Sequence, residues 1–378
     1  MNSKHSIMCV IGTRPEAIKL APVIREIRGR DTLESVLVST GQHREMLQQV
    51  MSLFELEADT DLKIMRPGQD LFDVTASVLL GMRDAIRRYT PSMVVVQGDT
   101  TSCFVGALAA FYESVPVAHV EAGLRTYDLS APFPEEANRQ LASRIATLHF
   151  PPTEGSRAHL LHEGVDPTRV VVTGNTVIDA LLWVRDHVAT ADDLPSSTRA
   201  RTRTRPYVLI TGHRRENFGA GFENLCTAIA KLANQYPDWD FVYPVHLNPR
   251  VQEPVNRILG SCDNVVLMEP QGYAPFVALM DGARFILTDS GGVQEEAPSL
   301  GKPVLVMREK TERPEAVEAG TVRLVGTNTN QIVTETRRLI EDSNHYELMA
   351  QAHNPYGDGH ASQRIVDEIY TYLSGGRS

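Results

Sequence analysis

Charged side chains follow one predicted β-strand after another along this chain of 378 residues. In the first half, Asp99 follows the apolar run 93–97 and Glu121 follows the run 115–120. The pattern recurs in the second half, where the residues that follow predicted strands include His213, His246 and Asp289. Ligands of open α/β sheets bind beyond the carboxyl ends of the strands, so a site is expected at this edge. Carboxylates and imidazoles placed there can act in general acid–base catalysis.

A second pattern suits a phosphate group. Ser290, Gly291 and Gly292 stand between a predicted strand and a predicted helix, where glycines let the backbone approach a phosphate and the helix N-terminus offers N–H groups. Strand–glycine–helix turns are also a common structural solution, so this signal is weak by itself. The cations available to a diphosphate in place of a metal are Arg14, Lys19, His213, Arg214 and Arg313. No P-loop and no dinucleotide-binding glycine fingerprint follows the first strand, so we expect no nicotinamide cofactor.

Each charged residue also has a structural interpretation. A single aspartate after a strand is more often a helix cap than a catalytic group. An ion pair with a neighbouring arginine is the alternative for each carboxylate. For Asp99 and Glu121 an ion pair is the weaker interpretation compared with a catalytic role. For Glu135 the two interpretations are about equal, because Arg139 lies one helical turn further on. The pair Asp59 and Asp61 is interpreted as part of a surface loop, and no metal site is predicted.

Composition excludes several classes of protein. The formal net charge of −10 argues against a nucleic-acid partner, because such a partner needs a basic surface. The four cysteines are widely spaced, which favours a reducing compartment over a disulfide framework. Neither a signal-peptide pattern nor an apolar run long enough for a membrane span is found. These observations predict a cytoplasmic protein.

Predicted strands alternate with helical patterns, which indicates parallel sheets. The strands predicted in the first half are residues 7–12, 35–39, 93–97, 115–120, 148–150 and 170–173. Those in the second half are residues 207–211, 241–245, 265–268, 285–288, 304–307 and 321–325. The polar segment 189–205, with its basic run, is interpreted as a solvated connector in preference to a phosphate site. We therefore expect an α/β protein of two Rossmann-like, doubly wound domains, residues 1–175 and 176–361, with a final helix at about 362–378 that packs back on the first.

The segments together resemble the non-hydrolysing bacterial UDP-N-acetylglucosamine 2-epimerases over nearly the whole chain. The matching motifs in the first half are GTRPEAIK at 12–19, GQHREM at 41–46, GDTT at 98–101, HVEAGLR at 119–125, PEEANR at 134–139 and GNTVID at 174–179. Those in the second half are GHRREN at 212–217, PVHLNP at 244–249, DSGGVQEE at 289–296 and ERPEA at 312–316. The resemblance implies a glycosyltransferase-B-like fold with the active site in the interdomain cleft. It also implies a cytoplasmic homodimer that supplies surface polysaccharide synthesis.

The resemblance implies a role for each motif. The catalytic residues that it implies for this chain are Asp99, Glu121, Glu135 and His213. UDP and the reacting end of the sugar would be held by Arg14, Lys19, Gln271, Phe276, Ser290, Gly291, Gly292, Glu296 and Arg313. An activating second UDP-N-acetylglucosamine would contact Gln42, His43, Gln69, Glu136, Arg214 and His246.

The reaction implied is reversible inversion at C2 of UDP-N-acetylglucosamine to give UDP-N-acetylmannosamine. UDP would leave and re-add through a 2-acetamidoglucal, with a cationic His213 beside the diphosphate and without a cofactor. The alternatives are an epimerase of the same fold acting on another UDP-N-acetyl sugar, a hydrolysing 2-epimerase, a glycosyltransferase and, outside enzymes, a nucleotide-sugar sensor.

Overall fold

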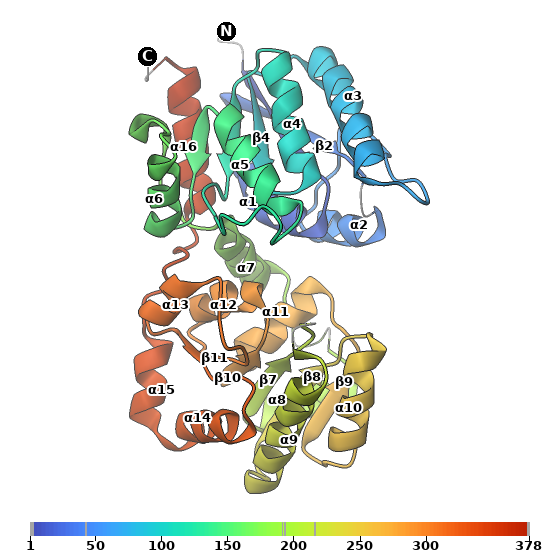
Figure 1. Ribbon diagram of the computed structural model, residues 1–378, viewed down its shortest axis with the longest axis vertical. Coiled ribbons are helices and arrows are strands. Elements are labelled where there is room, and N and C mark those ends of the chain that lie inside the picture. Colours follow the sequence, from blue (N-terminus) through green and yellow to red (C-terminus); the bar gives the residue numbers. More distant parts are fainter. Residues whose placement is uncertain (1–3, 42–43, 191, 193, 215–216, 376–378) are drawn as a thin grey trace. The chain divides into compact units, whose positions relative to one another are not determined.

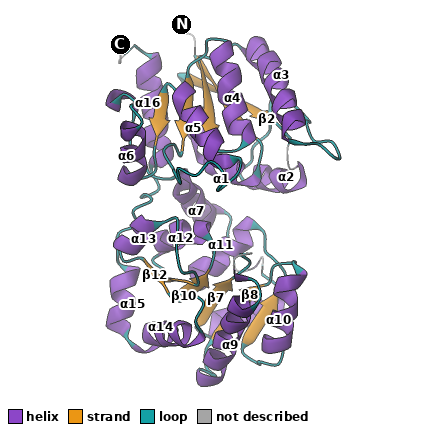
Figure 2. Ribbon diagram, in the orientation of Figure 1, coloured by secondary structure: helices purple, strands orange, loops and turns teal. Residues whose placement is uncertain are grey.

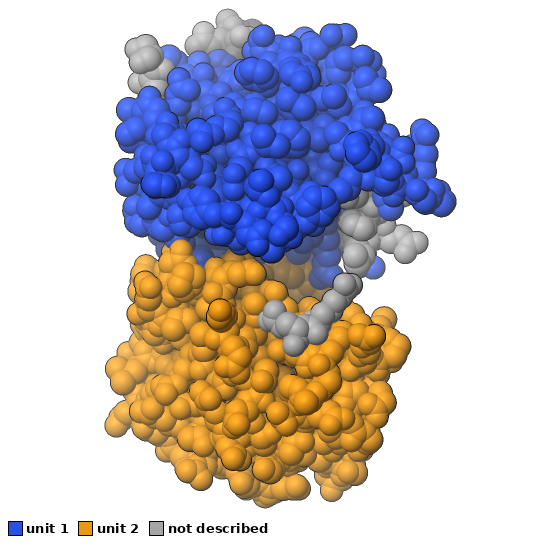
Figure 3. Space-filling model, in the orientation of Figure 1, with its two compact units in different colours: residues 1–180, 356–378 blue, residues 181–355 orange. Residues whose placement is uncertain are grey.

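The computed structural model describes residues 4–41, 44–190, 192, 194–214 and 217–375 (Figure 1). The chain divides into two compact units (Figure 3). Unit 1 comprises residues 1–180 and 356–378, and unit 2 comprises residues 181–355. Each unit is described by itself below.

Unit 1 is built on a parallel sheet in the order β3-β2-β1-β4-β5-β6. Figure 2 shows the strands in orange and the helices in purple. Its strands are β1 (His5–Ile11), β2 (Leu33–Ser39), β3 (Thr60–Asp61), β4 (Met93–Gln97), β5 (Val117–Val120) and β6 (Leu148–Phe150). Its helices are α1 (Arg14–Arg28), α2 (Arg44–Leu53), α3 (Leu71–Tyr89), α4 (Thr101–Tyr112), α5 (Glu135–Ile145), α6 (Glu154–His162) and α16 (Ala361–Leu373), with a 3₁₀ turn η1 (Pro167–Arg169). Helix α4 packs between α3 and α5, whereas α1 packs between α2 and α16, so helices form two layers around the sheet.

Unit 2 repeats this architecture with the strand order β12-β11-β10-β7-β8-β9. Its strands are β7 (Tyr207–Thr211), β8 (Asp240–Pro244), β9 (Val265–Met268), β10 (Phe285–Thr288), β11 (Val304–Val306) and β12 (Val322–Leu324). Its helices are α8 (Ser196–Thr204), α9 (Ala220–Gln235), α10 (Pro249–Leu259), α11 (Tyr273–Gly282), α12 (Gly291–Glu296), α13 (Pro314–Glu318), α14 (Thr329–Glu341) and α15 (Ser343–Ala350), with a 3₁₀ turn η4 (Ala297–Leu300). The expected α/β class with two doubly wound sheets is confirmed.

Both sheets follow one topological rule. The chain starts at a central strand, β1 or β7, winds to one edge, and then crosses back to β4 or β10 on the other side of the starting strand. Each sheet therefore has one switch point, between β1 and β4 in unit 1 and between β7 and β10 in unit 2. Ligands of doubly wound sheets bind outside the carboxyl ends of the strands at such switch points.

The central strands are apolar on both faces because helices cover both sides of each sheet. All five residues of β4 are buried, as are Phe285–Thr288 in β10. Close packing also explains Gly12, which follows β1: a Cβ atom there would lie 2.3 Å from Oγ of Ser102. The glycine thus lets the first turn of α1 approach α4 at the switch point.

Helix α7 (Thr176–His187) carries the chain from unit 1 into unit 2, and α16 returns to unit 1. Asp179 on α7 holds the start of α16, since its carboxylate accepts from the N–H of Ala361 at 3.2 Å and from the N–H of Ser362 at 2.7 Å. Asp367 on α16 pairs with Arg30 at 2.7 Å. The final helix is therefore part of the unit 1 fold.

Three local predictions are wrong, two about strands and one about the segment 189–205. Residues 170–173 form no strand, because only Val170 bridges to His149 of β6. The Asp59–Asp61 segment is not a surface loop: Thr60 and Asp61 pair with β2 as an edge strand.

The segment 189–205 is not a plain solvated connector, because part of it forms α8. Arg201 on α8 makes a two-point ion pair with the fully buried carboxylate of Asp240, at 2.8 and 3.0 Å. The basic run is thus used to attach α8 to β8.

None of the described helices is long and apolar enough to cross a lipid bilayer.

Candidate functional site

The switch point of unit 1 is occupied by a buried ion pair. Lys19 on α1 donates to both carboxylate oxygens of Glu121, at 2.6 and 2.7 Å. Asn175 donates to Oε1 of Glu121 at 3.2 Å, and Gln97, the last residue of β4, donates to Oε2. Glu121 follows β5 with a φ of 61°, a left-handed conformation that costs free energy for a side chain other than glycine. The surrounding donors therefore hold this carboxylate in a defined place.

Asp99 lies beside this ion pair, directly after β4 and Gly98. Oδ2 of Asp99 accepts a hydrogen bond from Arg139 Nη2 at 2.6 Å. Burial raises the pKa of Asp99 above its ordinary value; Arg139 and Lys19 oppose this rise, and the negative charge of Glu121 adds to it. A carboxylate whose pKa is raised by its surroundings is suited to both accepting and releasing a proton near neutral pH.

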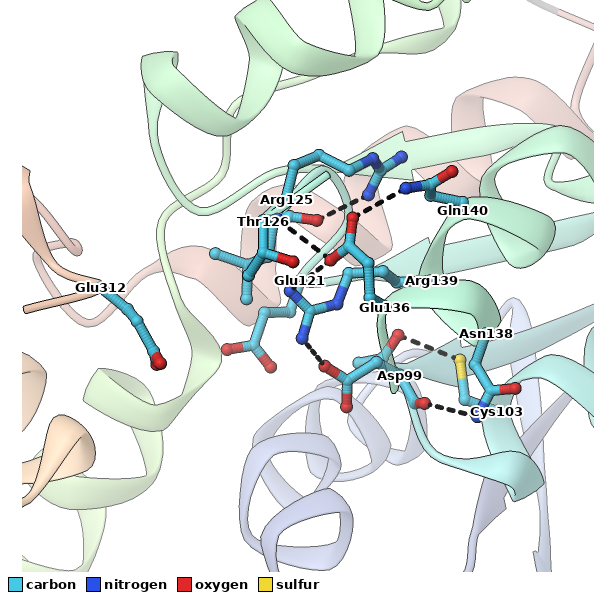
Figure 4. A network of polar contacts seen from close by, with 12 residues as sticks. Asp99, Cys103, Glu121, Arg125, Thr126, Glu136, Asn138, Arg139, Gln140 and Glu312 are labelled. Atoms are coloured by element: carbon cyan, nitrogen blue, oxygen red, sulfur yellow. Dashed lines mark hydrogen bonds and ion pairs between the residues drawn. The ribbon is translucent and has the colours of Figure 1, made fainter. Parts of the chain in front are cut away.

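Arg139 is itself held by a second carboxylate (Figure 4). Its Nη1 lies 3.3 Å from Oε2 of Glu136, which is fully buried. Glu136 also accepts from the main-chain N–H groups of Thr126 and Tyr127, each at 3.1 Å, and from Gln140 at 2.8 Å. Burial alone would raise the pKa of Glu136, but these hydrogen bonds and Arg139 outweigh burial and lower it. Glu136 thus ties the 126–127 backbone to the arginine that contacts Asp99.

These contacts correct the expected ion pairs. Arg139 pairs with Asp99 and Glu136, and not with Glu135 one helical turn before it. Asp99 pairs with an arginine, the alternative that the sequence had disfavoured, whereas Glu121 pairs with Lys19; both carboxylates lie at the switch point. Glu135 is half-buried at the start of α5, and within the described chain its side chain makes no hydrogen bond.

Two buried histidines lie beneath this group of residues. His119 on β5 donates through Nε2 to the carbonyl oxygen of Gly98 at 2.7 Å, and it is the sheet neighbour of His149 on β6. Burial lowers the pKa of His119 to about 4 and that of His149 to about 3. Both imidazoles are therefore neutral at pH 7, and neither is a candidate for the proton transfer.

These histidines predict a loss of stability in mild acid. Because their folded-state pKa values lie below the ordinary 6.5, the unfolded chain binds more protons between about pH 6.5 and 4. The free energy of unfolding should fall as the pH falls through this window, by up to about 1.4 kcal/mol per pH unit for each histidine. Urea titrations at several pH values test this prediction, and His149→Gln, which cannot titrate, should show a shallower dependence than the natural protein. An equal pH dependence in the two proteins would contradict it.

In unit 2, the switch point is organised around Asp289. This fully buried residue follows β10, and its Oδ2 accepts from the N–H groups of His213 and Arg214, each at 2.8 Å. The His213 ring stacks on His246, which follows β8, with the ring centroids 5.2 Å apart and the planes 10° apart. The ends of β7, β8 and β10 thus bring His213, Arg214, His246 and Asp289 together, as the strand-end pattern predicted.

In the ligand-free protein the surroundings of His213 disfavour its cationic form, which was expected only beside a bound diphosphate. Although 46% of its side-chain surface is accessible, burial of the rest lowers its pKa. Asp289 opposes this shift, whereas His246 and Arg214 add to it. Protonation of His213 at pH 7 therefore requires additional negative charge, such as that of a bound diphosphate.

The glycine turn that follows Asp289 lies beside two guanidinium groups. A Cβ atom on Gly291 would be 3.5 Å from Arg214 Nη2 and 3.9 Å from Arg313 Nη2. Arg313 also donates through Nε to the buried carboxylate of Glu295 on α12. Ser290, Gly291 and Gly292 thus present backbone next to two positive charges, an arrangement suited to a diphosphate.

The other predicted binding residues of unit 2 lie near this turn in the sequence. Glu296 is buried at the end of α12 and accepts from Tyr273 Oη at 2.9 Å. Gln271 donates to the carbonyl of Glu269 at 2.6 Å, and Phe276 is half-buried on α11. Gln271 and Glu269 are neighbours in the sequence, whereas Glu296 and Tyr273 are 23 positions apart.

The remaining predicted residues are less gathered. Arg14 is half-buried in the first turn of α1, next to the switch point of unit 1. Gln69 accepts from the N–H of Arg66 at 2.6 Å, in the loop before α3. Gln42 and His43 lie outside the described residues.

Several residues of the site were missed from the sequence. Gln97, Arg139 and Asn175 contact the predicted carboxylates, and Glu16 caps the turn after β1, accepting from the N–H groups of Gly12 and Thr13 at 2.9 and 2.7 Å. All four lie within or directly beside the motifs quoted above. Their polar character close to a strand end was the signal available, but most of their partners lie far away in the sequence. Glu16 too accepts from the Thr100 hydroxyl, 84 positions further on.

Comparison with known proteins identifies the family of this chain. The family model for UDP-N-acetylglucosamine 2-epimerase matches residues 25–370. The chain is 56% identical over 367 residues to the UDP-N-acetylglucosamine 2-epimerase of Yersinia pestis, covering 96% of this chain and 98% of that one.

Solved structures give the same result. The crystal structure of the Neisseria meningitidis UDP-GlcNAc 2-epimerase bound to UDP-GlcNAc matches with a TM-score of 0.85 at 49% identity, covering 97% of this chain and 100% of that one. The Methanocaldococcus jannaschii enzyme in complex with UDP-GlcNAc and UDP matches with a TM-score of 0.76 at 32% identity, covering 97% and 99%. The chain therefore belongs to the UDP-N-acetylglucosamine 2-epimerase family, and its fold is glycosyltransferase-B-like.

Proposed function

We propose that this protein interconverts UDP-N-acetylglucosamine and UDP-N-acetylmannosamine by elimination and re-addition of UDP. The observation that carries the proposal is the pair of carboxylates at one switch point, with Glu121 fixed by Lys19 and the half-buried Asp99 beside it. Inversion of C2 requires a proton to leave one face of the sugar and another to arrive on the opposite face. Two positioned carboxylates supply the two proton-handling groups that such a reaction needs.

The chemistry begins at C1 because the C2 proton of the sugar is not adjacent to a carbonyl. When the C1–O bond to UDP breaks, positive charge develops beside C2 and its proton becomes acidic. A carboxylate then removes that proton, which leaves 2-acetamidoglucal and free UDP. Return of a proton to the other face of C2 and re-formation of the C1–O bond give the epimer, so atoms and charge balance without a redox step.

The residues divide between the two reacting parts of the substrate. Asp99, Glu121 and Glu135, with Arg14 and Lys19, are assigned to the reacting end of the sugar. The UDP part is assigned to the residues of unit 2, namely His213, Gln271, Phe276, Ser290, Gly291, Gly292, Glu296 and Arg313. Donors aimed at the departing diphosphate stabilise the charge that develops there, which is commonly a large part of catalysis.

The first test is product analysis with UDP-N-acetylglucosamine as the sole substrate, by NMR. UDP-N-acetylmannosamine is the expected product; free N-acetylmannosamine would indicate the hydrolysing reaction. No change without an acceptor sugar would favour a glycosyltransferase or a sensor. Activity is expected to persist in EDTA and without NAD, and its loss on chelation with rescue by a divalent ion would contradict the proposal.

Isotopes test the mechanism itself. In D2O the product should carry deuterium at C2, and oxygen-18 placed in the bridge between C1 and the β-phosphate should appear in non-bridging positions, because freed UDP can rotate before it re-adds. Exchange at C2 alone is insufficient, since an oxidation–reduction route through a 3-keto sugar also allows it. Inversion with neither isotope change would refute elimination.

Arg313→Ala is predicted to weaken UDP binding. The variant removes one of the two guanidinium groups beside the glycine turn and leaves the buried Glu295 without its cationic partner. Charge-assisted hydrogen bonds contribute about 1.5–3 kcal/mol each, so the Kd for UDP should rise roughly 10- to 100-fold. Titration calorimetry measures the change, with Arg337→Ala on the exposed face of α14 as the control. An unchanged Kd would refute the assigned role of Arg313.

We further propose that a second UDP-N-acetylglucosamine activates the enzyme through Gln42, His43, Gln69, Glu136, Arg214 and His246. Glu136 supports this proposal because its carboxylate is linked through Arg139 to Asp99. The expected kinetics are a sigmoidal rate curve and a slow reverse reaction until some UDP-N-acetylglucosamine is present. Hyperbolic curves in both directions would count against an activator.

A cytoplasmic homodimer completes the proposal. All four cysteines are free thiols, in keeping with a reducing compartment. The adjacent helices α3 and α4 expose Phe72, Leu80, Phe111 and Tyr112, with between 52% and 84% of each residue accessible. Exposed apolar side chains of this size occur in protein interfaces, so we place the dimer contact on these two helices. Sedimentation analysis should find a dimer that Phe111→Asp weakens; a monomer at micromolar concentration would exclude it.

A further inference from the structure

The two carboxylate oxygens of Asp289, which follows β10, have different environments. Oδ2 accepts from the N–H groups of His213 and Arg214, each at 2.8 Å, with Asn217 Nδ2 at 3.4 Å. Tyr243 holds the preceding residue, since its hydroxyl donates to the carbonyl of Gly212 at 2.9 Å. The backbone that carries His213 is therefore fixed from both sides.

The other oxygen faces the imidazole. Oδ1 lies 3.8 Å from Nδ1 of His213, and among the described residues it accepts no hydrogen bond although Asp289 is fully buried. The His213 ring is confined by its stack on His246. His246 Nδ1 accepts from the N–H of Asn248 at 3.0 Å, which keeps that ring in place. A hydrogen bond between Nδ1 and Oδ1 requires the His213 ring to shift toward Asp289 within the stack, because the separation of 3.8 Å is too long for one.

We propose that Asp289 is a positioning residue for His213. Its carboxylate holds the imidazole proton on Nδ1, so that Nε2 is presented to the diphosphate, and it stabilises the imidazolium that forms when the diphosphate binds. This inference rests on the role proposed above for His213 and names the group that sets its tautomer and charge. A buried carboxylate has the same effect on the histidine of hydrolytic triads.

The charges around His213 fit this role. Arg214 on the same loop and His246 from the end of β8 both disfavour an imidazolium, as does burial. Asp289, from the end of β10, is the neighbouring charge in the described chain that favours it. An incoming diphosphate adds negative charge on the open side of the ring. The carboxylate and the ligand together then outweigh burial of the ring and the positive charge of Arg214.

The decisive variant is Asp289→Asn. Asparagine Oδ1 can still accept from the two main-chain N–H groups, whereas its Nδ2 would donate toward Nδ1 of His213 and move the imidazole proton to Nε2. The readout is ¹⁵N NMR of the histidine side chains with and without UDP, with His213 assigned by comparison with His213→Asn. We expect wild-type His213 to carry its proton on Nδ1 when free and to be doubly protonated with UDP at pH 7. In the variant it should stay neutral with its proton on Nε2.

Kinetics and a control variant distinguish a role of Asp289 in positioning the His213 imidazole from a role in holding the backbone alone. The kcat of Asp289→Asn should fall roughly 10²-fold, with a smaller change in KM. Asn217→Ala removes the weakest donor to the same carboxylate and should lower stability while keeping the Nδ1 tautomer. Retention of the Nδ1 proton or of wild-type kcat in Asp289→Asn would overturn the inference.

The test does not depend on turnover. If Asp289→Asn fails to fold, the wild-type tautomer still decides, because a proton on Nε2 alone in the ligand-free protein would overturn the inference. Since UDP is the probe, failure of the wild-type protein to form UDP-N-acetylmannosamine would count against the proposed function and leave the tautomer result valid.

Discussion

Replacement of Asp99 by asparagine is expected to lower kcat roughly 10²–10⁴-fold, which corresponds to about 3–5 kcal/mol of activation free energy. Asparagine preserves the shape of the side chain and can still accept the hydrogen bond from Arg139 that Oδ2 accepts at 2.6 Å. It cannot accept or release a proton. The substitution therefore removes the proposed chemical role while leaving the neighbouring ion pair of Lys19 and Glu121 intact.

The measurement is steady-state kinetics combined with deuterium incorporation at C2. Both should decline together in Asp99→Asn, whereas UDP affinity should change little because the diphosphate contacts are assigned to unit 2. Asp84→Asn is the matched control: its carboxylate is exposed and pairs with Arg83 at the surface of α3. Wild-type turnover in Asp99→Asn would remove Asp99 from the mechanism.

The sequence predicted the strands best where a short, largely apolar run is bounded by turns; the two longest strands, β1 and β2, each begin two residues earlier than predicted. The segments 93–97, 148–150, 207–211, 265–268 and 285–288 agree with the observed strands at both ends. Strand β3 was missed because two residues, Thr60 and Asp61, are too short for any periodicity. Its pairing with β2 is a tertiary contact, which local pattern cannot reveal.

Helix α8 was also missed because local sequence pattern does not reveal it. Its residues are Ser, Thr, Arg and a single Ala, so no apolar periodicity distinguishes it from a loop. What attaches it to unit 2 is the ion pair of Arg201 with Asp240, 39 positions further along the chain. A basic run without a visible partner was naturally interpreted as solvated.

The sequence predicted which residues form the site better than it predicted which of them form ion pairs with each other. Strand-end residues such as Asp99, Glu121, His213 and Asp289 do gather at the two switch points, because parallel strands share one carboxyl edge. Helical spacing suggested Glu135 as the partner of Arg139, but Arg139 pairs with Glu136 on the same helix and with Asp99, 40 positions away. Long-range contacts of this kind also set the protonation of each group, so its charge could not be predicted from spacing.

Glu121→Gln should be as damaging to turnover as the Asp99 variant, with a roughly 10²–10⁴-fold loss of kcat, and it should also destabilise unit 1. Glu121 receives hydrogen bonds from Lys19, Gln97 and Asn175 and is 7% exposed. A glutamine there can accept through only one oxygen, so its amide nitrogen would face another donor. A buried donor without an acceptor costs about 1–3 kcal/mol, which thermal unfolding should reveal.

A double variant separates the loss of activity from the loss of stability. Gln97→Glu combined with Glu121→Gln keeps one carboxylate and one amide in contact and keeps a negative charge near Lys19, but it moves the carboxylate from the end of β5 to the end of β4. Much of the lost stability should return, because the donor–acceptor pairing is restored with its direction reversed. Turnover should remain low if catalysis depends on a carboxylate at position 121. Recovery of kcat along with stability would mean that Glu121 acts only as the counter-ion of Lys19, and the second proton-handling group would then have to be Glu135.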